Sequence, residues 1–145
     1  MWRGVAAAIA GIVLSGLVMM VMETFGHAIF PLPADLDPTD PDQLRAAMTA
    51  GRIPTGALVS VLVGWAVSSF LGGLAAGYVA ERGWIAPLLV GAFLMLGGVA
   101  QFLMIPHPTW MIVGGTLCFI PLALAGGAVG QRVSGWDPEP GPEVE

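Results

Sequence analysis

The chain has 145 residues, of which 56% are hydrophobic and only 10% are charged. A soluble domain typically has about 25% charged residues, and one this small could not bury so much apolar surface, which indicates a membrane protein. The net charge of −5 and the lack of lysine exclude a nucleic-acid-binding protein, which needs a basic surface. A single cysteine, Cys118, excludes an internal disulfide.

The first predicted membrane-spanning helix covers residues 4–29. This apolar run is long enough to cross a bilayer, and no signal-peptidase site follows it, so we expect an uncleaved helix rather than a signal peptide. Pro31 and Pro33 end the helix, because proline cannot continue its backbone hydrogen bonds.

The long loop over residues 30–53 contains one stretch with helical signals. Asp40 is a favourable cap, Pro41 a favourable first position and Gly51 a plausible stop. A short interfacial helix over residues 43–50 and a plain connector with one helical turn are both compatible with these signals.

Three further membrane-spanning helices are predicted over residues 54–80, 85–105 and 109–132. Short turns connect them, and an acidic, proline-rich tail over residues 135–145 follows the four-helix domain of residues 1–134. The sequence therefore predicts an all-α membrane protein with four transmembrane helices, short turns, and one long outer loop.

The helix over residues 54–80 has small residues at helical spacing, which predicts close packing against other helices. In lipid this glycine-rich segment still forms a helix, because the backbone must satisfy its own hydrogen bonds. We expect the packing face to include Gly64, Ser68, Gly72, Gly73, Ala76 and Gly77.

The arginines predict the orientation of the chain in the membrane. Arg3, Arg82 and Arg132 all fall on one side of a four-helix arrangement, whereas Arg45 and Arg52 fall on the other side among aspartates. Because arginine-rich segments stay on the cytoplasmic side, we expect both termini to be cytoplasmic in a bacterial inner membrane.

Three ionisable residues are the candidate site: Glu23, His27 and His107. Glu23 and His27 are four residues apart on one helix face, and His107 lies at the outer end of the other helix pair, so all three can share an outer-leaflet pocket. They are interpreted as structural hydrogen-bonding groups, as a proton or ligand site, or as part of a metal site. The metal alternative uses His27 and His107 with nearby methionine thioethers, a set that suits Cu(I).

Other polar residues give no catalytic signal. Gln101 is expected to find a partner across the bundle, such as Ser15 or Thr116. No nucleophile-elbow, zinc-protease or phosphate-loop pattern is present, so we expect no enzymatic activity and no cofactor.

Three strings support a resemblance to a known group: Glu23-x-x-Gly26-His27-x-x-Phe30-Pro31-x-Pro33, Asp37-Pro38, and Ile105-Pro106-His107-Pro108-x-Trp110. Together they resemble a group of small, uncharacterised four-helix membrane proteins of bacteria, over most of residues 1–132. The resemblance implies a four-helix membrane fold and marks Glu23, His27 and His107 as recognisable positions of that group.

Two functions are compatible with these features. The first is a non-enzymatic accessory subunit that packs against a larger membrane complex of respiratory or photosynthetic type. The alternative is a small oligomeric transporter, channel or metal-handling protein that uses the pocket of Glu23, His27 and His107. The expected partners are the lipid bilayer and other membrane subunits or further copies of the chain, with no nucleic acid.

Overall fold

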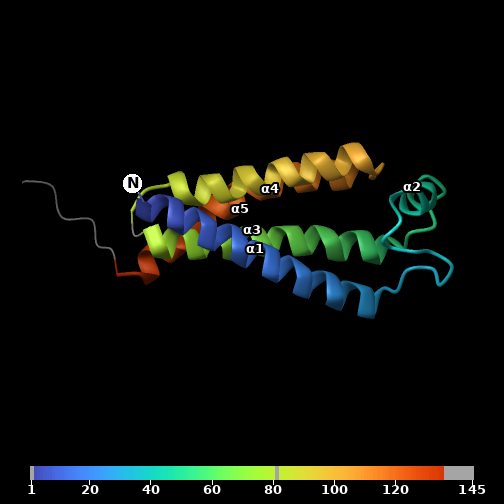
Figure 1. The fold of residues 1–145 in the computed structure, drawn as a ribbon, viewed down its shortest axis with the longest axis horizontal. Helices are drawn as coiled ribbons and strands as arrows, with labels where there is room; N and C mark the ends of the chain where they lie inside the picture. The colour runs from blue at the N-terminus through green and yellow to red at the C-terminus, as the bar shows by residue number, and fades with distance from the viewer. Residues whose placement is uncertain (1, 81, 136–145) are drawn as a thin grey trace, which may run out of the picture.

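The computed structural model describes residues 2–80 and 82–135, which form five helices and no strand (Figure 1). The helices are α1 (Trp2–Ile29), α2 (Pro41–Thr49), α3 (Thr55–Ala80), α4 (Ile85–Met104) and α5 (Thr109–Val133). Apart from Gly135, the predicted acidic tail lies outside the described residues, and so does Glu81 in the predicted turn between α3 and α4.

Four of these helices are long and apolar enough to cross a membrane, which supports the predicted multi-pass membrane protein. α1, α3, α4 and α5 have 28, 26, 20 and 25 residues. At a rise of about 1.5 Å per residue the shortest spans about 30 Å, the thickness of a bilayer's hydrocarbon core. The described chain begins and finishes at one end of the bundle, called here the terminal end, and α2 lies at the opposite loop end (Figure 1).

Helix α3 lies at the centre of the bundle and packs against each of the other three long helices. The predicted small residues of α3 are all buried, and they face other helices of this same chain. A Cβ atom added at Gly72 would overlap Ser15 of α1, and one added at Gly73 would overlap the backbone of Ala123 in α5. The small residues of α3 therefore allow the helices of this one chain to approach one another closely. Those helices also cover the small residues.

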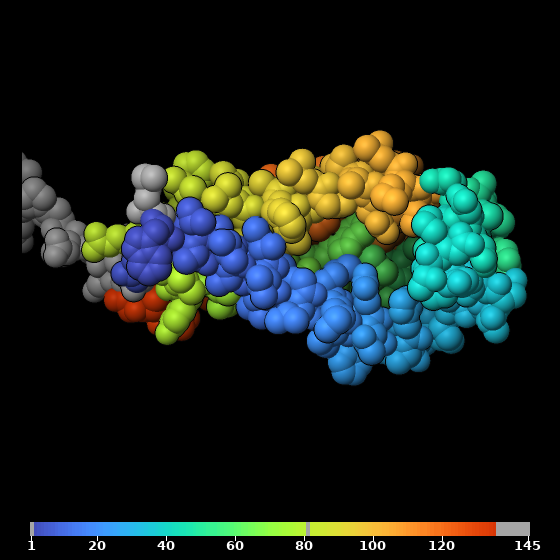
Figure 2. Space-filling model, viewed as in Figure 1, coloured from blue at the N-terminus to red at the C-terminus, as the bar shows by residue number. Residues whose placement is uncertain are grey.

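Helices α1 and α4 pack together at the terminal end of the bundle. There Ala7 and Ala8 of α1 pack with Ala76 of α3 and with Ala86 and Val90 of α4. Towards the loop end α1 and α4 diverge (Figure 1), and a hollow between them leaves α3 visible from the side (Figure 2).

The loop between α1 and α3 forms the short helix α2 rather than a plain connector. The side chain of Asp40 caps α2 by accepting hydrogen bonds from the backbone N–H groups of Asp42 and Gln43, and Pro41 is its first residue. Arg45 of α2 donates hydrogen bonds of 3.1 and 2.7 Å to the carbonyl oxygen of Met104 at the end of α4. These contacts hold α2 across the loop end of the bundle.

Candidate functional site

The hollow at the loop end is a cavity of about 500 Å³ lined by α1, α3, α4 and α5, with α2 and its flanking loop as the roof. Its open side lies between α1 and α4 (Figure 2). Most of the lining is apolar, and the larger polar side chains in it are Glu23, His27, Gln101 and His107. The cavity lies within the range of about 300–1,000 Å³ that is usual for small-molecule sites.

Two glycines keep the cavity wide where α1 and α4 face each other. Gly16 of α1 and Gly97 of α4 both line the cavity, and a Cβ atom added at either would meet no atom within 4 Å. These glycines differ from Gly72 and Gly73, whose added Cβ atoms would collide with a neighbouring helix. Here the missing side chains leave open space instead of a helix contact.

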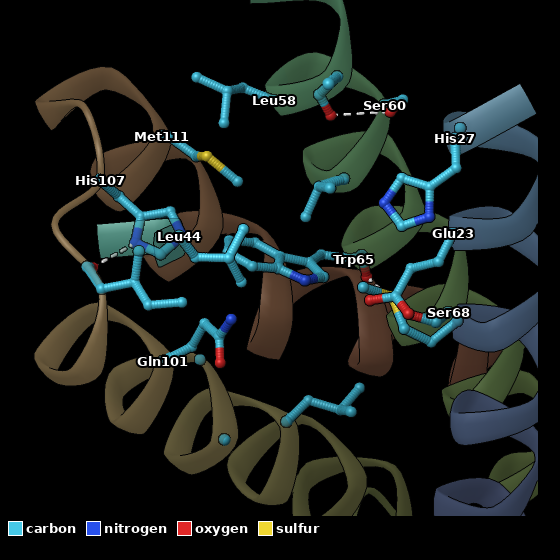
Figure 3. Close-up of a pocket in the computed structure, with 18 of the residues that line it drawn as sticks. Glu23, His27, Leu44, Leu58, Ser60, Trp65, Ser68, Gln101, His107 and Met111 are labelled. Carbon is cyan, nitrogen blue, oxygen red and sulfur yellow. Dashed lines mark hydrogen bonds between the residues drawn. The ribbon is translucent and has the colours of Figure 1, made fainter. Parts of the chain in front are cut away.

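Glu23 and His27 form the polar part of the α1 wall, one helical turn apart. Both side chains extend from α1 towards the space in front of Trp65 (Figure 3). Within the described residues neither side chain makes a hydrogen bond or an ion pair, including with the other. The carboxylate and the imidazole are therefore both free to bind a molecule in the cavity.

His107 lies on the opposite side of the cavity, in the turn between α4 and α5 (Figure 3). Its Nδ1 atom lies 2.7 Å from the carbonyl oxygen of Ile105, and its ring lies 5.3 Å from that of Phe102 in a T-shaped contact. Because a carbonyl oxygen only accepts hydrogen bonds, Nδ1 carries the proton, and in the neutral ring Nε2 remains an acceptor.

The three predicted site residues therefore line one cavity but come from different walls. Within the described residues, no three His, Cys, Asp or Glu side chains are grouped so that they could hold a metal ion. Of the methionines that the copper alternative uses, Met19 and Met111 line the cavity and Met22 and Met104 do not; Met48 of α2 also lines it. The copper alternative therefore has no support from grouped His, Cys, Asp or Glu side chains in the described part of the chain.

The expected partnership of Gln101 with Ser15 or Thr116 is wrong. The Ser15 hydroxyl instead donates to the carbonyl oxygens of Gly11, at 2.9 Å, and Ser68, at 3.0 Å. The Gln101 side chain lines the cavity and has no hydrogen-bond partner among the described residues. The divergence of α4 from α1 separates Gln101 from Ser15.

Trp65 is a lining residue that the sequence prediction missed. Its side chain is only 8% exposed and packs against the rings of Phe102, Phe119 and His107 at centroid distances of 5.5, 5.6 and 6.3 Å. Phe70 and Tyr78 also stand next to small residues of α3, so the sequence contains no signal that sets Trp65 apart as a lining residue. Trp65 forms the back wall of the cavity.

The roof of the cavity is held by polar contacts outside the apolar segments. Arg52 donates to both carboxylate oxygens of Asp35 at 2.7 Å, and this pair closes the loop around α2. The adjacent guanidinium lowers the pKa of Asp35 below its ordinary value. The pKa of Asp40 is also lowered, first by its hydrogen bond from the Gln43 side chain and then by the α2 backbone N–H groups.

Comparison with protein-family models, with curated proteins and with solved structures finds no match for this chain. The resemblance to small bacterial four-helix membrane proteins therefore stays a prediction. Function is inferred from the shape and chemistry of the cavity.

Proposed function

We propose that this chain is a non-enzymatic, multi-pass membrane protein that binds a small amphipathic molecule in the loop-end cavity. The observation that carries the proposal is a largely apolar cavity of about 500 Å³ that contains unpaired polar side chains and opens sideways between α1 and α4. An apolar lining with a few convergent polar groups is the usual composition of a small-molecule site.

The position of the opening favours a ligand that arrives through the bilayer. α1 and α4 are both long enough to span, so the gap between them faces hydrocarbon when the helices are embedded. A molecule with an apolar body can enter by this route and place its polar group against Glu23, His27 or Gln101. The roof formed by α2 covers the same cavity on the loop side.

The packing of the terminal end supports binding rather than conduction. The cluster of Ala7, Ala8, Ala76, Ala86 and Val90 lies between the cavity and that end of the bundle. This cluster contains no polar side chain, so an ion would meet an unfavourable apolar barrier there. A continuous channel through one copy of the chain is therefore disfavoured.

The alternative is the accessory subunit of a larger respiratory or photosynthetic complex. The surface available for it is an exposed apolar stripe along α1, formed by Val5, Ile9, Val13 and Leu17. Such a stripe suits either lipid tails or another subunit. The small residues of α3, which would have suited close packing with a partner or a second copy, are already covered within the chain.

We further propose the bacterial inner membrane, with both termini cytoplasmic and the cavity in the outer leaflet. Arg3, Arg82 and Arg132 lie at the terminal end together with Trp2 and Trp84. Arginine and tryptophan at one boundary are typical of a cytoplasmic interface.

Photolabelling of the reconstituted full chain tests the binding function. The probe is a long-chain alcohol that carries a diazirine, and mass spectrometry maps its adducts. We expect adducts on cavity-lining residues such as Met19 and Phe93, and we expect Gly97→Leu to remove them by filling the cavity. Gly4→Leu is the matched control, because Gly4 also has open space around it but does not line the cavity.

Two results would count against the proposal. One is labelling spread evenly over the cavity and the exposed stripe of α1, and the other is labelling of the cavity that Gly97→Leu leaves unchanged. Co-purification of a stoichiometric membrane subunit in mild detergent, combined with either result, would favour the accessory-subunit alternative.

A further inference from the structure

The charge of the cavity is unbalanced. Among the described residues Glu23 is the only carboxylate in the lining, no arginine lines the cavity, and neither of its two histidines, His27 and His107, forms an ion pair with Glu23. The two arginines at the loop end are occupied elsewhere, Arg45 by Asp42 and the Met104 carbonyl, and Arg52 by Asp35. A carboxylate facing a low-dielectric space without a counter-charge is costly, and a cationic partner removes much of that cost.

The serine hydroxyls of the cavity are arranged to accept rather than to donate. Ser60 donates its proton to the Ala57 carbonyl at 2.8 Å, Ser68 donates to the Trp65 carbonyl at 3.1 Å, and Ser15 also donates to backbone carbonyls. Each hydroxyl has one proton, and because Ser15 and Ser68 are buried, at 0% and 2% exposure, the lone pairs that remain for a ligand are those of the half-buried Ser60. The Nε2 atom of His107 is an acceptor when its ring is neutral, and the donors that remain are the Gln101 amide, the His27 ring and the indole N–H of Trp65.

Aromatic surface adds to this preference. The indole of Trp65 lies at the back of the cavity, in the space towards which Glu23 and His27 extend (Figure 3). Tryptophan is the side chain whose ring face attracts cations most strongly. Glu23 and Trp65 can therefore contact opposite sides of one positively charged group.

From these observations we propose that the ligand of the cavity is a lipophilic organic cation and that Glu23 recognises its charge. The inference rests on the proposed ligand-binding function and adds the chemical class of the ligand. Anionic amphiphiles such as fatty acids are disfavoured on the same grounds, because they would place a second negative charge beside Glu23 with no arginine in the lining to balance it.

Equilibrium dialysis of the detergent-purified full chain tests the charge preference with two probes of matched shape, tetraphenylphosphonium and tetraphenylborate. We expect the cation to bind at least roughly tenfold more tightly than the anion. Glu23→Gln should weaken binding of the cation by roughly tenfold or more, and Glu23→Asp, which keeps the charge, should retain part of the binding. Thermal unfolding of each variant verifies that it is folded.

Equal binding of the two probes, or cation binding that Glu23→Gln leaves unchanged, would overturn the assignment of a cationic ligand. The diazirine alcohol separates this failure from failure of the proposed function, because it is uncharged. If the alcohol labels the cavity of both wild type and Glu23→Gln while the two charged probes bind equally, the cavity does bind ligands. Only the proposal that the ligand is a cation then fails. If neither probe nor alcohol enters the cavity, both proposals fail.

Discussion

Gly73→Ala tests whether backbone contact between α3 and α5 holds the bundle together. A Cβ atom at this position would lie 2.6 Å from both Cα and the carbonyl carbon of Ala123, and it would overlap the carbonyl oxygen. Ordinary carbon–carbon contacts are about 3.5–4.0 Å, so the two helices must separate locally by about 1 Å. Neither contact atom belongs to a flexible side chain that could rotate away.

The expected loss of stability follows from that displacement. A gap of 0.5–1 Å forfeits about a quarter to a half of the dispersion energy of each contact it opens, and overpacking of a filled interior costs about 1–3 kcal/mol. We therefore expect Gly73→Ala to destabilise the bundle by about 1–3 kcal/mol. Equilibrium unfolding by sodium dodecyl sulfate in mixed micelles, followed by tryptophan fluorescence, measures the difference.

The matched control is Gly97→Ala, which also adds one methyl group in the interior of a long helix. Nothing lies within 4 Å of the added atom, so its effect should stay within about 0.5 kcal/mol. If Gly73→Ala unfolds at the same detergent fraction as this control, close contact between α3 and α5 does not stabilise the fold, and our account of the packing is wrong.

Two smaller predictions concern the polar contacts around the cavity. Ser15→Ala removes the hydroxyl that donates to the Ser68 carbonyl at 3.0 Å. Hydrogen bonds between membrane helices average about 0.6 kcal/mol, so the same detergent titration should show a loss of unfolding free energy below about 2 kcal/mol. A larger loss would contradict this reasoning. The Asp35–Arg52 contact lowers the pKa of Asp35 below 3.8, so its contribution is present at neutral pH and is lost only as the pH falls through that lowered pKa. The protection of α2 against hydrogen exchange, taken relative to the intrinsic exchange rate at each pH, should fall in that acidic range in wild type, whereas Arg52→Gln should show low protection already at neutral pH.

The sequence alone determined where the helices begin and end, because those signals are local. Pro31 and Pro33 follow the last residue of α1, and the Asp40–Pro41 pair begins α2. The four predicted spans differ from the observed helices by only one or two residues at their ends. The length and polarity of each run are enough to predict a membrane-spanning helix, whatever its neighbours are.

The candidate site was only partly predictable. Glu23, His27 and His107 are conspicuous in sequence because ionisable residues are rare in apolar helices. Their placement around one cavity, with Trp65 behind them and Gln101 unpaired, depends on how far α1 diverges from α4. Sequence spacing specifies which side chains share a helix face, but it contains no information about the angle between two helices.

The glycines show this limit most clearly. Gly72 and Gly97 are both interior glycines of apolar helices, and each is followed by a second glycine. The helical periodicity of the sequence does not distinguish one from the other. In the folded chain Gly72 meets the backbone of Gly11 across a tight contact, whereas Gly97 borders an open cavity. A missing side chain permits either close approach or empty space, and only the tertiary arrangement of the helices decides which of the two occurs.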